Sequence, residues 1–168
     1  MMDKEIRKAT MDDLACIMKI YAYARVFMKS HGNPRQWAAT NWPPEGLIRQ
    51  DIENGKCYVC TVQDHIAGVF YYDFGANAEK GYLDIEGKWK DDTPYGVVHR
   101  IASDGSEKGI GKFCIDWAYG QCHHLRMDTH PDNIVMQNLL KKLGFEKCGI
   151  IHVPEDNDPR YAYEKFSR

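Results

Sequence analysis

The sequence lacks several features that would each define a class of protein. No apolar run approaches the roughly 20 residues that a membrane-spanning helix needs. The first residues, Met-Met-Asp-Lys-Glu-Ile-Arg, do not form the apolar segment of a secretory signal. Internal repeats, low-complexity segments and linker-like stretches are also missing. We therefore expect a cytoplasmic protein with no membrane partner, folded as one domain over residues 1–168.

An excess of positive charge is missing as well. The chain has 22 Lys and Arg against 24 Asp and Glu, which gives a net charge of −2. Nucleic-acid binding usually depends on a concentrated basic surface, so we expect no nucleic-acid partner. The 168 residues, 43% of them hydrophobic, are enough to bury a substantial core.

The six cysteines do not form a metal-binding pattern. Cys57 and Cys60 have the spacing of zinc ligands, but Cys-Tyr-Val-Cys has the pattern of a strand, in which residues three apart face opposite sides. Cys122, His123 and His124 are adjacent, so their side chains diverge. We expect reduced cysteines and no bound metal; a metal or redox protein built on these residues is an alternative from another class.

Hydrophobic periodicity predicts alternating strands and helices, which favours an α/β or α+β domain. The predicted strands cover 6–9, 57–62, 66–74, 95–102, 125–130, 145–153 and 161–166, and the pair 57–62 and 66–74 reads as a hairpin. The predicted helices cover about 10–30, 44–53, 112–119 and 133–144. Residues 75–92 are polar and irregular, and the pattern assigns them no element.

The stretch from Val97 to Lys112 organises the rest of the chain. A β-rich run there enters a turn with Gly109 and Gly111, and a helix pattern follows directly. The first turn of a helix has unpaired N–H groups and a partial positive charge, so this arrangement predicts a site for a phosphorylated cofactor. A P-loop is excluded because Ser106 occupies the position of its first glycine. A dinucleotide-binding fingerprint is only weakly matched, because Cys114 occupies the position of its third glycine.

Two blocks resemble the GNAT superfamily of N-acetyltransferases. The turn Ser106-Glu107-Lys108-Gly109-Ile110-Gly111 resembles the family's acyl-CoA turn, Arg/Gln-x-x-Gly-x-Gly/Ala, with Ser106 in place of Arg or Gln. The run from Asn133 to Phe145 resembles the second signature, Asn-x-x-Ala-x-x-Leu-Tyr-x-Lys-Leu-Gly-Phe, but has Leu140 at the tyrosine. The blocks occur in the family's order, and the order of predicted elements also matches.

This resemblance implies the GNAT fold, a mixed central sheet of about six or seven strands flanked by about four helices. It also implies that the fourth and fifth strands splay apart and hold the pantetheine arm of acetyl-CoA as if it were an extra strand. The cofactor-binding residues implied are Ile101, Ala102, Ser106, Glu107, Lys108, Gly109, Ile110, Gly111, Lys112, Asn133, Met136, Leu140 and Lys142.

The implied chemistry is direct attack of an amine on the acetyl thioester, for which the amine must lose a proton. His99 is the predicted base, because histidine titrates near neutral pH. A regular strand would put its side chain on the same face as that of Ile101. Asp128 and His130 are further catalytic candidates on the neighbouring strand. Leu140 cannot supply the proton that a tyrosine would give to the leaving thiolate, so the source of that proton stays open.

The acceptor is expected to be a primary amine that binds against Trp37, Trp42, Tyr71 or Tyr72, and Tyr95. Its identity stays open, with a small amine, an amino-acid or antibiotic amine and a protein N-terminus as alternatives. A homodimer is also possible on this resemblance. The rival prediction is a non-catalytic acyl-CoA-binding or regulatory module with the same fold.

Overall fold

The computed structural model describes residues 3–167. Its elements follow the predicted order, with one added strand. The strands are β1 (Lys4–Lys8), β2 (Cys57–Val62), β3 (His65–Gly75), β4 (Glu86–Gly87), β5 (Tyr95–Ser103), β6 (His124–Thr129), β7 (Glu146–His152) and β8 (Pro159–Phe166). The helices are α1 (Leu14–Ser30), α2 (Glu45–Glu53), α3 (Ile110–Cys122) and α4 (Ile134–Lys142), with short 3-10 turns η1 (Met11–Asp13) and η2 (Lys80–Asp84).

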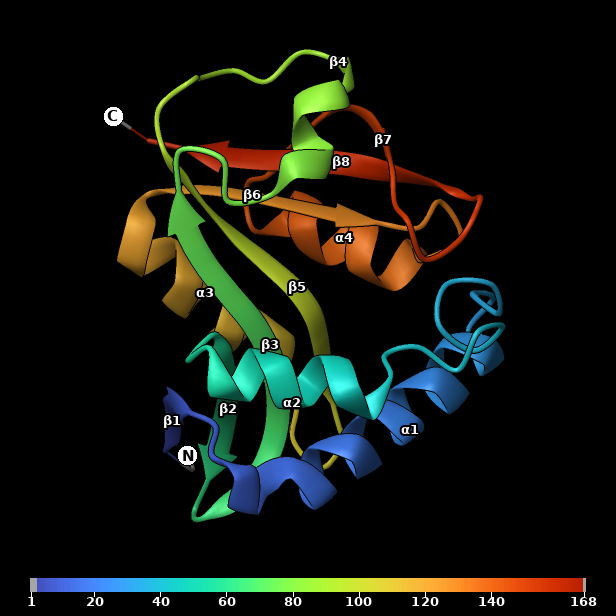
Figure 1. The fold of residues 1–168 in the computed structure, drawn as a ribbon, viewed down its shortest axis with the longest axis vertical. Helices are drawn as coiled ribbons and strands as arrows, with labels where there is room; N and C mark the ends of the chain where they lie inside the picture. The colour runs from blue at the N-terminus through green and yellow to red at the C-terminus, as the bar shows by residue number, and fades with distance from the viewer. Residues whose placement is uncertain (1–2, 168) are drawn as a thin grey trace.

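The strands form one mixed sheet in the order β1-β2-β3-β5-β6-β8-β7-β4. The two-residue strand β4 pairs with β7 at the edge, which accounts for the eighth strand beyond the six or seven expected. β5 and β6 are the parallel neighbours, and they pair only at Gly96–Leu125 and Val97–Arg126. Beyond these pairs the two strands diverge, as Figure 1 shows. The predicted splay is therefore present.

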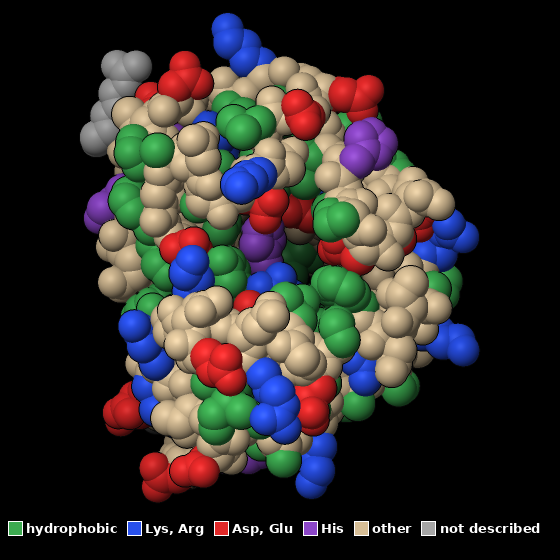
Figure 2. Space-filling model, viewed as in Figure 1, with side chains coloured by type: hydrophobic (Ala, Val, Ile, Leu, Met, Phe, Trp, Pro, Cys, Tyr) green, Lys and Arg blue, Asp and Glu red, His purple; other side chains and the backbone are tan. Residues whose placement is uncertain are grey.

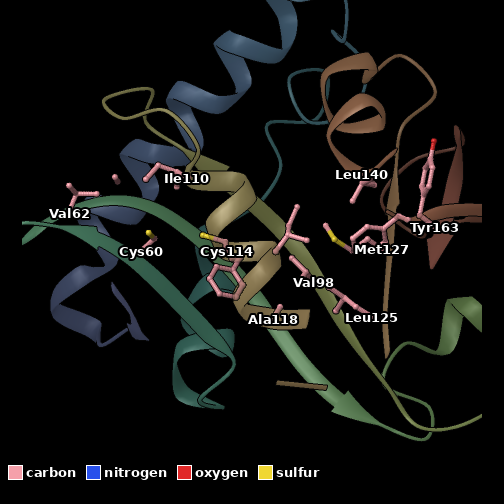
Figure 3. Packing of buried hydrophobic residues seen from close by; sticks show 14 residues of the cluster. Cys60, Val62, Val98, Ile110, Cys114, Ala118, Leu125, Met127, Leu140 and Tyr163 are labelled. Atoms are coloured by element: carbon pink, nitrogen blue, oxygen red, sulfur yellow. The ribbon is translucent and has the colours of Figure 1, made fainter. Parts of the chain in front are cut away.

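Helices cover the two faces of the sheet differently. α3 and α4 cover one face, where Ile110, Cys114, Ile115 and Leu140 pack against β2, β3, β5 and β6. Figure 3 shows this cluster, in which Val98 and Met127 lie near side chains of both helices. α1 and α2 cover the opposite face over β2, β3 and the C-terminal end of β5. The segment with η2 covers another part of this face, where Tyr82 packs on Tyr95 and Val97.

Local sequence explains where several elements begin. Thr10 and Asp13 form a capping box, and Asp13 also accepts two hydrogen bonds from Arg7. Cys57 and Cys60 face opposite sides of the sheet, as the strand pattern predicted, because Cys57 packs under α1 and α2 while Cys60 packs on the α3 side. No helix in the described part of the chain is long and apolar enough to cross a membrane.

Candidate active site

The split between β5 and β6 opens into two cavities that meet. Cavity 1, of about 320 Å³, lies between β5, β6, the loop after α1 and the segment that follows β7. Figure 2 shows this face hollowed between its upper and lower parts, with acidic and histidine side chains in the hollow. Cavity 2, of about 250 Å³, lies between α1, the end of β5 and the starts of α3 and α4. Met28, Ile101, Asn133 and Met136 line both cavities.

A β-bulge shapes the wall that β5 contributes. Tyr71 pairs with His99 and Val69 with Ala102, so two residues of β5 stand opposite one residue of β3. Arg100 lies in this bulge with φ of 50°, which is uncommon for a residue other than glycine. Its guanidinium bonds Asp51 of α2 through Nε and Nη2, at 2.9 and 3.0 Å.

The bulge overturns one expectation from the sequence. A regular strand would put the side chains of His99 and Ile101 on one face, but Ile101 packs against the α3 cluster. His99 instead contacts the rings of Tyr71 and Tyr82 on the opposite face. The extra residue reverses the alternation, so the side chains of His99 and Ile101 lie on opposite faces of the sheet.

His99 stands between two carboxylates in cavity 1. Its Nε2 lies 2.9 Å from Glu79 Oε2, and its Nδ1 lies 3.8 Å from Asp128 Oδ2. The Nε2–Glu79 contact is not an aligned hydrogen bond, and it becomes an ion pair when the His99 ring is protonated. Contact with His99 holds the pKa of the Glu79 carboxyl below its usual range, even though burial opposes the shift. The hydroxyl of Tyr82 donates to Asp128 at 2.7 Å and fixes that carboxylate.

The other predicted catalytic residue has a different position. His130 is 4% exposed, and its Nε2 lies 2.8 Å from Asp158 Oδ2, which Arg35 also binds. His130 Nδ1 accepts the backbone N–H of Asp132. His130 lines neither cavity, so the structure offers no contact that would support its predicted catalytic role. The residue stabilises the turn between β6 and α4.

The predicted acceptor residues separate into two groups. Trp37 and Trp42 both line cavity 1. Tyr95 is 3% exposed, its hydroxyl donates to the backbone oxygen of Glu79, and it does not line cavity 1. Tyr71 does not line the cavity; it packs beside His99, and Arg100 lies over its ring. Tyr72 packs on Trp117 on the opposite face.

The Gly-rich turn stands at the end of cavity 2. Gly109 has φ of 79° and precedes α3, whose first amides, at Ile110, Gly111 and Lys112, have no helical carbonyl to bond. Gly111 lines cavity 2. The residues Ser106, Glu107, Lys108, Gly109, Ile110 and Lys112 do not line it, and they form the turn and the helix start beside it.

Two side chains of that turn already have partners. The amide and hydroxyl of Ser106 both donate to Asp104 Oδ1, so the amide of Ser106 is not available to a ligand. Lys112 makes an ion pair with Asp116 one helical turn later. Ser106 therefore shapes the turn through Asp104, which differs from the direct contact predicted for it.

The second sequence block supplies the facing wall. Asn133 Oδ1 caps α4 by accepting from the amide of Met136, and its Nδ2 donates to Gln36. One N–H of the Asn133 amide then remains for a ligand. Leu140 is fully buried in the core, and the exposed Lys142 lines neither cavity. The two cavities therefore give no support to the predicted cofactor contacts of Leu140 and Lys142.

Sequence reasoning missed the carboxylates of cavity 1 other than Asp128. Glu79 comes from the segment to which no element was assigned, and Glu155 from the turn before β8. Burial raises the pKa of Glu155 above its usual range, and the negative charge of Asp128 adds to the rise. Neither residue belongs to a local motif, so only the fold brings them to the site.

Buried polar atoms without hydrogen-bond partners belong to residues that line the two cavities. Among residues 3–167, three buried side-chain atoms have no hydrogen-bond partner: Asn33 Oδ1, His99 Nε2 and Thr129 Oγ1. Asn33 lines cavity 2, and the other two residues line cavity 1. Because a buried polar atom without a partner costs free energy, these atoms indicate a site that water or a ligand completes.

A split parallel strand pair beside a Gly-rich helix start is the arrangement of a GNAT acetyltransferase. The solved structure of a GNAT-family acetyltransferase from Streptococcus agalactiae 2603 matches with 29% identity and a TM-score of 0.87, over 98% of this chain and 96% of that one. The resemblance to the GNAT superfamily is thus confirmed, and the chain has the GNAT fold.

More distant structures show the fold alone. A GNAT-family acetyltransferase from Listeria monocytogenes 4b F2365 has 20% identity and a TM-score of 0.71, over 98% of this chain and 95% of that one. The ribosomal-protein-S18-alanine N-acetyltransferase from Escherichia coli has 13% identity and a TM-score of 0.61, over 97% and 93%. The sequence matches no protein-family model and no curated protein.

Proposed function

We propose that this protein is an N-acetyltransferase that transfers the acetyl group of acetyl-CoA to a primary amine. The observation that carries the proposal is the split between β5 and β6, whose two cavities share Ile101, Asn133 and Met136. A cosubstrate in cavity 2 and an acceptor in cavity 1 would meet at these shared residues. The transfer then needs no covalent intermediate on the protein.

Cavity 2 suits the pantetheine arm. The edge of β5 beyond Val97 is not paired with β6, so its backbone groups can bond the amides of the arm as an added strand. Met136, Leu139 and Val135 supply apolar surface from α4. The pyrophosphate would lie at the first turn of α3, where free amides and the helix dipole favour negative charge.

The proton of the attacking amine would leave through His99. The ring lines cavity 1 close to the shared residues, and a proton taken by its nitrogen forms an imidazolium that Glu79 and Asp128 stabilise. The amine then attacks the thioester carbon, the C–S bond breaks, and CoA leaves as a thiolate. Solvent can protonate this thiolate, because an ordinary thiol has a pKa of about 8.5.

Two measurements test the proposal in order. Acetyl-CoA at 100 times its Kd should stabilise the protein by about 2.7 kcal/mol, while NAD and ATP should not. Thiol release from acetyl-CoA should then occur with at least one class in a panel of amines. No stabilisation by acetyl-CoA would exclude the proposal. Stabilisation without release for any amine class would favour the rival function, a non-catalytic acyl-CoA-binding module, which agrees with the burial of Leu140 in the core.

A further inference from the structure

Cavity 1 presents more negative than positive charge. Three carboxylates line it, from Glu79, Asp128 and Glu155. Two arginines, Arg100 and Arg160, also line it. The net charge that surrounds an acceptor in cavity 1 depends on whether these two arginines are paired with carboxylates elsewhere.

Both arginines are neutralised by acids that do not line the cavity. Asp51 binds Arg100 with both carboxylate oxygens, at 2.9 and 3.0 Å. Asp156 binds Arg160 in the same way, at 3.1 and 2.8 Å. Arg160 is 2% exposed and also donates to backbone oxygens of its own turn. Each guanidinium therefore already holds a carboxylate outside the cavity. The charge of Arg160 still lowers the pKa of the Glu155 carboxyl, but burial outweighs this effect.

The three carboxylates of cavity 1 differ in the hydrogen bonds and charged contacts that they already make within the protein. Glu79 pairs with His99 at 2.9 Å, and Asp128 accepts the Tyr82 hydroxyl and lies 3.8 Å from His99. The carboxyl of Glu155 has no ion pair or side-chain hydrogen bond within residues 3–167, and it is half-buried. Burial and nearby negative charge raise its pKa, so a cation placed beside it would favour the ionised form.

A second observation points to a polar ligand in the same cavity. Thr129 lies at the end of β6, is 1% exposed, and its Oγ1 has no partner within the described chain. Its residue lines cavity 1 together with Glu155 and Asp128. A hydroxyl can accept a hydrogen bond from an ammonium or amine nitrogen. The apolar Trp37, Trp42 and Val153 complete the wall, which suits a short aliphatic chain.

We propose that the acceptor is a small diamine-like molecule, in which one amine is acetylated beside His99 and a second, cationic group is held at Glu155. This inference rests on the proposed acetyl transfer, since it names the substrate class of the same site. The cavity volume of about 320 Å³ suits a small molecule better than a protein segment. The second charge gives binding free energy and selects against acceptors with a distal carboxylate.

The test compares three probes with the same reacting amine: 1,4-diaminobutane, butylamine and 4-aminobutanoate. We expect kcat/KM in thiol release from acetyl-CoA to be highest for the diamine and lowest for the amino acid. Loss of a charged contact costs roughly tenfold or more. Glu155→Gln should therefore lower the diamine-to-butylamine ratio of kcat/KM by roughly tenfold. Glu53→Gln, an equal charge change at an exposed position of α2 outside both cavities, should leave the ratio unchanged.

The outcomes separate this inference from the proposed function. Butylamine equal to or better than the diamine, or an unchanged ratio in Glu155→Gln, would overturn the second-charge inference while acetyl transfer stands. Absence of stabilisation by acetyl-CoA would instead refute the proposed function. If no probe supports thiol release, calorimetric binding of the diamine and of butylamine to the CoA-saturated protein decides the inference. Tighter diamine binding that Glu155→Gln removes would support it, and equal binding would exclude it.

Discussion

His99 Nε2 lies 2.9 Å from Glu79 Oε2, although the two residues belong to separate elements, β5 and the segment before η2. The Glu79 carboxylate is held by a second contact, because its Oε1 accepts the backbone N–H of Gly81 at 2.9 Å. Asp128 stands on the other side of the ring. The proposed base, His99, therefore depends on a carboxylate from the segment that also carries Tyr82 and packs on the core around it.

Replacement of His99 should separate chemistry from cosubstrate binding. His99→Gln removes the proton acceptor but keeps a polar side chain, so we expect kcat to fall roughly 100-fold at neutral pH. The shift in melting temperature that acetyl-CoA produces should remain, because His99 does not line cavity 2. Thiol-release kinetics and thermal unfolding measure the two effects. Unchanged kcat would remove His99 as the base.

The ion pair in the bulge of β5 should matter for stability. The side chains of Arg100 and Asp51 are 16% and 8% exposed, and removing one partner of a buried pair leaves the other charge uncompensated. Arg100→Met should lower the free energy of unfolding by about 3 kcal/mol. The double variant Arg100→Met with Asp51→Asn should recover part of this loss. Urea unfolding checks both values, and a double variant no better than the single one would contradict the explanation.

Gly68 of β3 should allow the start of α3 to pack closely against the sheet. A Cβ at Gly68 would lie 2.5 Å from Ile110 Cγ2, at the first residue of α3. Gly68→Ala should therefore cost about 1–3 kcal/mol and weaken acetyl-CoA binding, because the helix start must move. Gly46→Ala is the matched control, since nothing lies near its Cβ in α2 and alanine favours a helix. Equal stability of the two variants would contradict this packing argument.

A buried carboxylate should give the protein an acid-sensitive stability. Burial alone would raise the pKa of Glu164, but hydrogen bonds from His124, from the amide of Lys90 and from Arg126 outweigh it and hold the pKa below its usual range. A lowered acid pKa stabilises the fold above the unfolded value near 4.5, and this contribution is lost as pH falls below it. The free energy of unfolding should decrease from pH 5 to pH 3, and Glu164→Gln should flatten that decrease. An unchanged slope would contradict the assignment to Glu164.

Sequence patterns were sufficient for most of the fold. Apolar periodicity located the four helices and all strands except β4, whose two residues are too few to show a period. The blocks around Gly109 and Asn133 identified the GNAT fold, because glycine conformation and helix capping are local requirements that leave local signals. Asn133 caps α4, and Gly109 takes the left-handed conformation that precedes α3.

The catalytic wall could not be predicted in the same way. The bulge at Arg100 depends on Asp51 and on the carbonyl contact with Tyr21, both distant in sequence, so the strand pattern misplaced Ile101 relative to His99. His130 looked available but is bound by Asp158, and Tyr95 is buried beneath the Glu79 segment. These outcomes depend on which side chains the fold brings into contact, and no local spacing encodes them.

By itself, the sequence determined the order of the elements and the Gly-rich helix start. Only the tertiary structure decided which charges face the acceptor cavity. Arg100 and Arg160 look like free cations in the sequence, but Asp51 and Asp156 pair with them, and the Glu155 carboxyl has no ion pair within residues 3–167. Charge balance in a half-buried cavity depends on distances of a few ångströms between residues far apart in sequence, and folding sets those distances.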